Sequence, residues 1–120
     1  MREYNYVDTD TAHNLHGAAR HNLKKAMQYI DDNLEKKMTL KEIANIACMS
    51  STYFSSVFKS FNGISPWDYI TIKRVENAIE LIKTTNMTII EIAEKCGFSS
   101  SSNFYKAFLR VTGKTPKNYE

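Results

Sequence analysis

The clearest pattern of hydrophobic and polar positions lies between residues 88 and 112, where two short amphipathic segments flank Gly97. In the first segment the apolar positions recur at helical intervals and are Ile89, Ile92, Ala93 and Cys96. Thr88 and Glu91 have the Ser/Thr-x-x-Glu spacing with which a cap and a first-turn residue satisfy each other's backbone donors. This pattern predicts a short helix that begins at about Ile89.

The second segment follows a predicted turn. Gly97 can take the positive φ that a chain reversal needs, and Phe98 is expected to pack back into the angle so formed. The serine run over residues 99–102 offers hydroxyl caps for a second helix, and Gly113 ends it. The apolar positions of that helix are Phe104, Ala107, Phe108 and Val111. Two short helices that cross at a tight turn form a helix-turn-helix, whose second helix fits the major groove of duplex DNA.

The same pattern occurs earlier in the chain. With a shift of 49 positions, Thr39, Glu42, Ile43, Ala44 and Ser50 map onto Thr88, Glu91, Ile92, Ala93 and Ser99. With a shift of 50 positions, Phe54, Phe58, Gly63, Pro66 and Tyr69 map onto Phe104, Phe108, Gly113, Pro116 and Tyr119. One residue is therefore inserted in the second serine run. Because two copies are too few for a solenoid, the repeat predicts a pair of DNA-reading units.

Helical periodicity also covers the segments around the repeat. An amphipathic helix is predicted from about Ala18 to Glu35, and the helices of the first repeat over about 40–47 and 51–61. The second of these is expected to bury Phe54, Val57, Phe58 and Phe61. A hydroxyl cap, a proline and an acid at residues 65–68 predict the start of a long helix that ends at about Thr84. The phenylalanines and Trp67 are expected in the core.

These elements predict an all-α fold of about seven helices, with two helix-turn-helix subdomains joined by a long linker helix. The expected organisation is a flexible N-terminal arm over 1–17, a first helix-turn-helix subdomain over 18–65, the linker helix over 66–84 and a second helix-turn-helix subdomain over 85–120.

The distribution of charge along the chain says more about its partner than the formal net charge of +3 does. Basic and acidic side chains balance over residues 1–38, so the basic excess lies in residues 39–120. No acid stands between Glu42 and Asp68, or between Glu94 and Glu120. Both predicted reading units are thus free of carboxylates that would repel phosphate, although a merely solvated basic face is the alternative.

Several classes of protein are disfavoured. No segment approaches the roughly 20 apolar residues that span a bilayer, and no secretion signal is present, which predicts a cytoplasmic, nucleoid-associated protein. The histidines at 13, 16 and 21 lack cysteines or carboxylates at matching intervals, so a solvated tail is favoured over a metal site. In that compartment Cys48 and Cys96 are expected to stay unjoined, with Cys96 in the core. No catalytic or cofactor motif appears, so neither an enzyme nor a cofactor is predicted.

Taken together, the residues from about Leu23 to Tyr119 resemble the DNA-binding domain of the AraC/XylS family of bacterial transcription regulators. The most specific part of the resemblance is the run Gly97-Phe98, Phe104, Phe108, Gly113-x-Thr115-Pro116-x-x-Tyr119. The resemblance implies double-stranded DNA as the partner and a transcription activator that contacts RNA polymerase. It also implies a possible effector or dimerisation domain outside this chain. Cys48 departs from the family pattern, because it stands where the second repeat has its turn glycine.

The resemblance further implies which residues meet DNA. Outward residues in the first half of each second helix are expected to read bases, and these are Thr52, Ser55, Ser56, Ser101, Ser102, Asn103, Tyr105 and Lys106. Candidates for phosphate contact are Thr39, Lys59, Thr88, Arg110, Lys114 and Lys117, the two threonines through the backbone amides at helix starts. The serines over 99–102 could equally be helix caps or solvated. Arg74 matches an arginine typical of the family's linker helix and could equally be a structural ion-pair residue.

The hydroxyl-only first unit is expected to discriminate bases less well than the second, which carries Asn103 and Lys106. A different class of function remains as an alternative, namely a helical adaptor that binds protein through its serine-rich faces. Helices without acids argue against that alternative.

Overall fold

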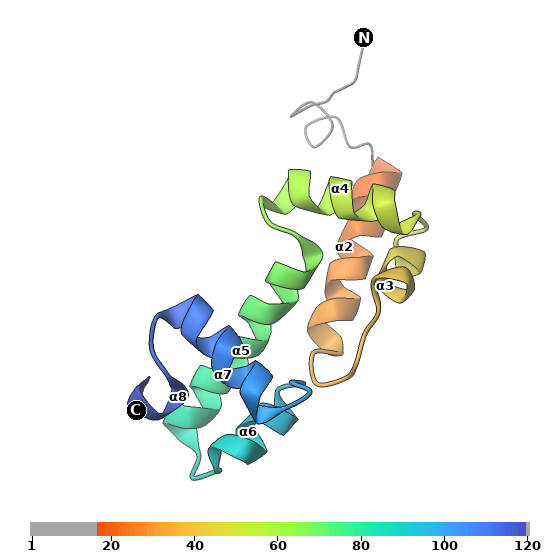
Figure 1. The fold of residues 1–120 in the computed structure, drawn as a ribbon. Helices are drawn as coiled ribbons and strands as arrows, with labels where there is room; N and C mark the ends of the chain where they lie inside the picture. Colours follow the sequence, from red (N-terminus) through yellow and green to blue (C-terminus); the bar gives the residue numbers. More distant parts are fainter. Residues whose placement is uncertain (1–16, 120) are drawn as a thin grey trace. The chain divides into compact units, whose positions relative to one another are not determined.

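The computed structural model describes residues 17–119, and over this range the chain is helical, with no strand (Figure 1). In chain order the helices are α2 (Gly17–Asp32), α3 (Leu40–Ile46), α4 (Ser51–Asn62), α5 (Pro66–Thr84), α6 (Ile89–Lys95), α7 (Ser101–Thr112) and α8 (Pro116–Tyr119). The prediction of an all-α fold with about seven helices is confirmed. The expected N-terminal arm, except for Gly17, lies outside the described residues, as do two of the three histidines.

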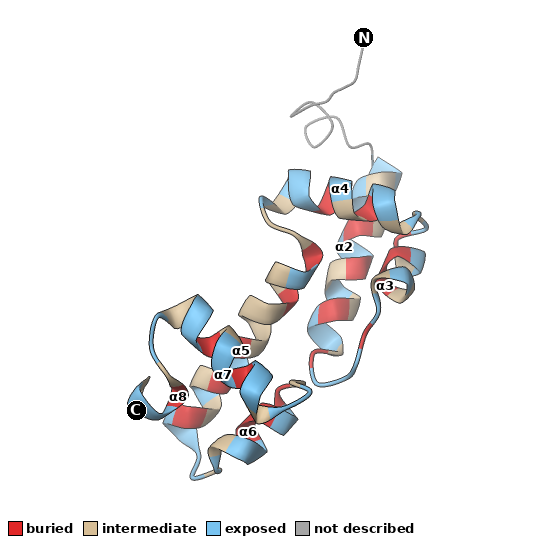
Figure 2. Cartoon of the chain, in the orientation of Figure 1, coloured by how far each residue is buried: buried red, intermediate tan, exposed pale blue. Residues whose placement is uncertain are grey.

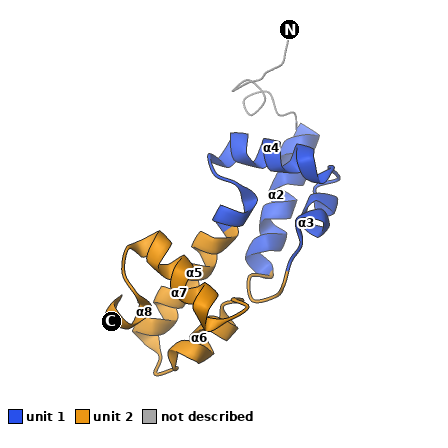
Figure 3. Cartoon of the chain, viewed as in Figure 1, with its two compact units in different colours: residues 1–32, 38–69 blue, residues 33–37, 70–120 orange. Residues whose placement is uncertain are grey.

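The chain divides into two compact units, which are coloured separately in Figure 3. Among the described residues, unit 1 contains 17–32 and 38–69, and unit 2 contains 33–37 and 70–119. Each unit holds one helix-turn-helix, made by α3 and α4 in unit 1 and by α6 and α7 in unit 2. Helix α5 contributes its first residues to unit 1 and the remainder to unit 2.

In unit 1, α3 packs against both α2 and α4 around an apolar core. The fully buried side chains recur at helical spacing along these helices (Figure 2), and the largest are Leu23, Ile30, Ile43, Phe54, Val57 and Phe58. Helix α3 begins with a capping box, in which the Thr39 hydroxyl accepts from the backbone N–H of Glu42 at 3.1 Å. Helix α4 begins at the N-cap Ser50 and ends at Gly63, whose φ is +82°.

Unit 2 uses the same local signals. Thr88 and Glu91 form the capping box of α6, Ser100 is the N-cap of α7, and Gly113 ends α7 with a φ of +80°. The core of the unit joins α5, α6 and α7, and its buried members are Val75, Ala78, Ile82, Ile92, Ala93, Cys96, Phe104 and Phe108. Because apolar residues of α5 cover the second helix-turn-helix, the part of this helix from Ile70 onward is a structural part of unit 2.

Aromatic packing repeats between the two units. The ring centroids of Phe54 and Phe58 are 5.6 Å apart in unit 1, as are those of Phe104 and Phe108 in unit 2. A tyrosine then meets the second phenylalanine edge-on at 5.4 Å in each unit, Tyr69 in the first and Tyr119 in the second. The repeat found in the sequence is therefore a repeat of packing as well as of pattern.

The N-cap residues of α4 and α7 show which residue is inserted in the second repeat. Ser50 and Ser100 both stand at the N-cap and accept from the backbone N–H three residues on, so they are equivalent with a shift of 50. The pairing of Ser50 with Ser99 expected from the sequence is wrong by one position. Ser99 is the extra residue, because the capping geometry fixes the register of the helix behind it.

The two turns have the same backbone form despite their different residues. Cys48 has a φ of +58° and Gly97 a φ of +94°. In each turn the next residue donates its N–H back to the first helix at 3.0 Å, from Met49 to Ala44 and from Phe98 to Ala93. Cys48 thus adopts the left-handed conformation that its glycine counterpart adopts, which costs a residue with a Cβ about 1–2 kcal/mol.

We therefore expect Cys48→Gly to keep or raise the stability of unit 1, by up to about 1 kcal/mol, because relief of the positive φ offsets the extra entropy of the unfolded chain. Cys48→Val should instead lower it by about 1–2 kcal/mol, since a β-branched residue tolerates positive φ worst. Thermal melts of both variants measure this. A Cys48→Val protein more stable than Cys48→Gly would contradict the strained turn.

Three sequence predictions are wrong, two about packing and one about where a helix ends. Phe61 is 37% exposed and Trp67 is 43% exposed, so neither is a core residue. Phe61 lies in the last turn of α4, past the buried residues of that helix, and Trp67 points away from the buried line of Pro66 and Ile70. Helix α2 ends at Asp32 rather than Glu35, because the chain turns there, with the N–H of Lys36 donating to the carbonyl of Asn33 at 2.9 Å.

Candidate nucleic-acid interface

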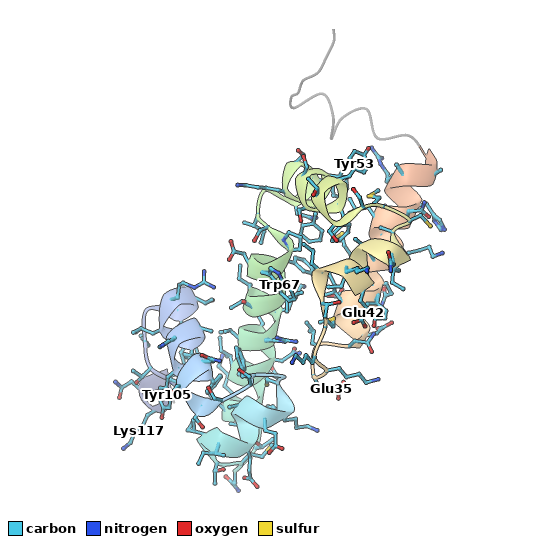
Figure 4. All side chains as sticks on the ribbon, turned by 45° about the vertical axis from the view of Figure 1, so that its right-hand side comes forward. Glu35, Glu42, Tyr53, Trp67, Tyr105 and Lys117 are labelled. Carbon is cyan, nitrogen blue, oxygen red and sulfur yellow. The ribbon has the colours of Figure 1, made fainter. Side chains whose placement is uncertain are left out.

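The outward face of α7 is set by what the helix buries. Phe104 and Phe108 are completely buried, which turns Tyr105 and Lys106, between them, away from the core of unit 2. The expected base-reading residues of this unit lie on that outward side, exposed at Ser102, Asn103, Tyr105 and Lys106 and partly buried at Ser101. Tyr105, 37% exposed, projects from the helix in Figure 4. The face presents an amide, a phenol, an ammonium and hydroxyls, which are groups that bond base edges or phosphates.

The serines over 99–102 were expected either to cap the helix or to face DNA or solvent, and they differ in which of these positions they occupy. Ser100 caps α7 by accepting from the N–H of Asn103 at 3.1 Å, and the Ser99 hydroxyl accepts from the Asn103 side-chain amide at 2.6 Å. Ser101 and Ser102 lie within the helix and have no capping role. Asn103 is thereby held in place at the start of the helix, with its orientation fixed from the turn.

The expected base-reading side chains on the outward face of α4 are shorter than those of α7. Thr52 and Ser56 are exposed and Ser55 is partly buried, so the expected base-reading residues of unit 1 offer only short hydroxyls. The sequence reading missed Tyr53, which is 50% exposed on the same helix (Figure 4). A shift of 50 pairs Tyr53 with Asn103, and this equivalence could have identified it, because Asn103 follows the inserted residue wherever that residue lies in the serine run.

The basic residues expected at phosphates are exposed at Lys59, Arg110, Lys114 and Lys117. Lys59 and Arg110 are not equivalent, however, because Leu109 occupies the α7 position that matches Lys59. Successive residues of a helix are rotated by about 100° around its axis. Arg110 is one residue past the position that matches Lys59, so the two cations do not lie on the same face of their respective helices. Leu109 is itself 50% exposed, in line with Ser102 and Lys106.

At the two helix starts expected to bind phosphate through amides, the amide of the capping threonine is already hydrogen-bonded. The N–H of Thr88 donates to the Glu91 carboxylate at 2.8 Å, and that of Thr39 donates to Glu42 at 3.4 Å. The Tyr29 hydroxyl also donates to Glu42, and this hydrogen bond raises the pKa of Tyr29. A carboxylate beside each threonine amide competes with phosphate for that site, which weakens the expected role of both threonines.

Arg74 lies close to Leu34, Lys36 and Gly97 within unit 2. Its Nε donates to the carbonyl of Leu34 at 2.8 Å and its Nη2 to the carbonyl of Lys36 at 2.9 Å. Burial lowers the pKa of the guanidinium. Arg74 is therefore structural, but it binds backbone carbonyls rather than the carboxylate of an ion pair. A Cβ on Gly97 would collide with the same Leu34 carbonyl and lie 2.9 Å from Arg74 Nε.

The thiols lie in different surroundings. Cys48 is exposed, whereas Cys96 is buried beside the turn and burial raises its pKa to about 11. Cys96 therefore stays protonated at neutral pH and acts as a small apolar core residue. Between residues 17 and 119, no group of His, Cys, Asp and Glu side chains could hold a metal ion. Nor does any helix in that range combine the length and apolarity needed to cross a bilayer.

Comparison with known proteins identifies this arrangement. A family model described as a helix-turn-helix domain matches residues 43–120. The probable transcriptional regulator LumQ of Photobacterium leiognathi is 37% identical over 92 residues, which cover 77% of this chain and 37% of LumQ. The chain spans about a third of the length of such curated relatives.

Solved structures agree. The DNA-binding domain of the global transcriptional factor AdpA, in complex with a target DNA, matches with a TM-score of 0.78 and 28% identity, covering 82% of this chain and 88% of that one. An AraC-type regulator from Chromobacterium violaceum matches with a TM-score of 0.76 and 25% identity, covering 87% of this chain and 93% of that one. The chain therefore belongs to the AraC-type family of DNA-binding helix-turn-helix transcription regulators.

Proposed function

We propose that this chain binds duplex DNA sequence-specifically, with α4 and α7 each entering a major groove, and that it activates bacterial transcription. The observation that carries the proposal is the outward face of α7, where Ser102, Asn103 and Lys106 stand exposed in front of fully buried phenylalanines. Side chains of these kinds bond base edges, and a helix held from behind by aromatic packing presents them in a fixed register.

The electrostatics of both helix-turn-helix units support the proposal. No carboxylate occurs over residues 43–67 or 95–119, so no negative charge in either segment opposes the phosphates. Four exposed cations, Lys59, Arg110, Lys114 and Lys117, are proposed to contact the DNA backbone. One of them, Lys114, also lies 6.0 Å from the ring centroid of Tyr119, which restrains its direction.

The two units are proposed to contribute unequally to sequence recognition. Asn can bond adenine in a bidentate manner and Lys can reach guanine acceptors, whereas hydroxyls accept or donate to several bases. Asn103 and Lys106 therefore give unit 2 more discrimination than Thr52, Ser55 and Ser56 give unit 1. A contact with RNA polymerase, and an effector or dimerisation domain outside these residues, belong to the proposal on grounds of family membership alone, as does a cytoplasmic, nucleoid-associated location.

Two lysines of unit 2 test the proposal. Lys106→Ala is expected to act mainly on the cognate site, with a loss of about 1–3 kcal/mol and relaxed preference at one or two base pairs. Lys117→Ala is expected to weaken cognate and scrambled duplexes alike and to reduce the salt dependence by about one unit of slope, since it releases one counterion fewer. Titrations of both variants against DNA fragments enriched by the wild-type protein, at several salt concentrations, measure this.

The result that would reverse these roles is an equal loss on both duplexes for Lys106→Ala with a changed sequence preference for Lys117→Ala. A wild-type protein whose binding to duplex DNA is indifferent to salt would instead favour the helical adaptor that binds protein through its serine-rich faces.

A further inference from the structure

Tyr53 is the largest side chain on the outward half of α4. It is the third residue of the helix, its backbone N–H donates to the Ser50 hydroxyl at 3.2 Å, and half of its surface is exposed. At about 100° per residue, Thr52 and Ser56 share the central line of the outward face at the start of the helix, and Tyr53 lies on its flank. Lys59 lies in the last turn of the helix. A capped first turn thus fixes where the tyrosine leaves the helix.

The matching position of α7 is occupied differently. Asn103 has the same capping bond from its N–H, but its side-chain amide also donates to Ser99, the residue that only the second unit contains. Unit 1 has no equivalent of Ser99, since its turn is one residue shorter. At one and the same position, unit 2 therefore has a short side chain tied to the turn and unit 1 has a long aromatic one that extends outward.

The chemistry of a flanking tyrosine fits the wall of a major groove. The central line of a helix in the groove faces the bases, and a long side chain on its flank can reach past the base edges to a sugar–phosphate strand. A phenol hydroxyl is among the neutral groups that donate to phosphate oxygens, and the ring can cover a deoxyribose. The remaining outward residues of α4 are short hydroxyls and Lys59, so Tyr53 is the long neutral side chain on this face.

We infer that Tyr53 is a DNA-backbone contact of the first unit, in which its hydroxyl donates to a phosphate oxygen and its ring packs on the adjoining sugar. The inference rests on the proposed function. It assigns to unit 1 an anchor that carries no charge, so this anchor contributes affinity without counterion release.

The test compares Tyr53→Phe, Tyr53→Ala and Lys59→Ala with the wild type on cognate and scrambled duplexes over a series of salt concentrations. Tyr53→Phe should lower affinity for both duplexes by a similar factor, about two- to tenfold as for one neutral hydrogen bond, with an unchanged salt slope. Tyr53→Ala should lower both further. Lys59→Ala, the matched charged control on the same helix, should reduce the slope by about one unit.

Unchanged affinity of both tyrosine variants would overturn the inference, and so would a loss confined to the cognate duplex, which would make Tyr53 a base contact. Since Tyr53 is exposed, thermal melts of the variants should match the wild type, and a variant that melts early is replaced by Tyr53→Gln in the same titration. If the wild type itself binds neither duplex with salt dependence, the proposed function has failed; if only the tyrosine variants behave unexpectedly, the inference alone has failed.

Discussion

Replacing Phe108 with alanine should destabilise unit 2 by roughly 3–5 kcal/mol, the cost of truncating a large core aromatic. Phe108 is completely buried, and its ring packs between those of Phe104 at 5.6 Å and Tyr119 at 5.4 Å. Its loss leaves a cavity behind the proposed reading face, so specific DNA binding should be lost together with the fold of the unit. Circular dichroism melts and DNA titrations of the variant measure both.

The matched control is the next residue. Leu109 is of similar hydrophobicity but 50% exposed, so Leu109→Ala should change stability by less than about 0.5 kcal/mol. The opposite order, with Leu109→Ala the more destabilised of the two, would mean that the helical register of α7 is wrong.

Gly97→Ala should be the most damaging of the glycine substitutions. Its φ of +94° disfavours any residue with a Cβ by about 1–2 kcal/mol. The added methyl group would also collide with the Leu34 carbonyl, which cannot move without breaking its 2.8 Å hydrogen bond to Arg74. Overpacking of this kind typically adds about 1–3 kcal/mol. Chemical denaturation of the variant measures the total.

Gly113→Ala separates the two contributions, because Gly113 has a φ of +80° and nothing within 4 Å of the added Cβ. It lies in the same unit and should show the backbone strain alone. Equal losses of stability in Gly97→Ala and Gly113→Ala would show that the Leu34 carbonyl moves aside without a further loss of stability.

Local signals made most of the fold predictable. Thr39 with Glu42, and Thr88 with Glu91, are capping boxes that can be read from spacing, and both are present. The glycines that end α4 and α7 are equally local, as is the buried stripe of phenylalanines. Such features depend on residues within one helical turn of each other, which is the range over which a single sequence is informative.

Long-range contacts were not predictable from the sequence. Arg74 and Leu34 are 40 positions apart, and no spacing rule joins an arginine to a backbone carbonyl. The exposure of Phe61 and Trp67 depends on which elements reach the ends of α4 and α5, information that periodicity does not contain. Tyr53 was missed for a different reason, since the shift of 50 that pairs the phenylalanines also pairs Tyr53 with Asn103 but was not applied to that position.

The short segment of residues 33–37 has a consequence for how this protein can be recombined. These residues precede the first helix-turn-helix in the chain but belong to unit 2, where the carbonyls of Leu34 and Lys36 bind Arg74. A chimera made by a single crossover between Pro66 and Arg74 would join Arg74 of one parent to the 33–37 segment of another. A fragment that begins at α5 would leave a half-buried guanidinium without its carbonyls. Exchange of the second reading unit between relatives therefore requires two grafts, one of them only five residues long.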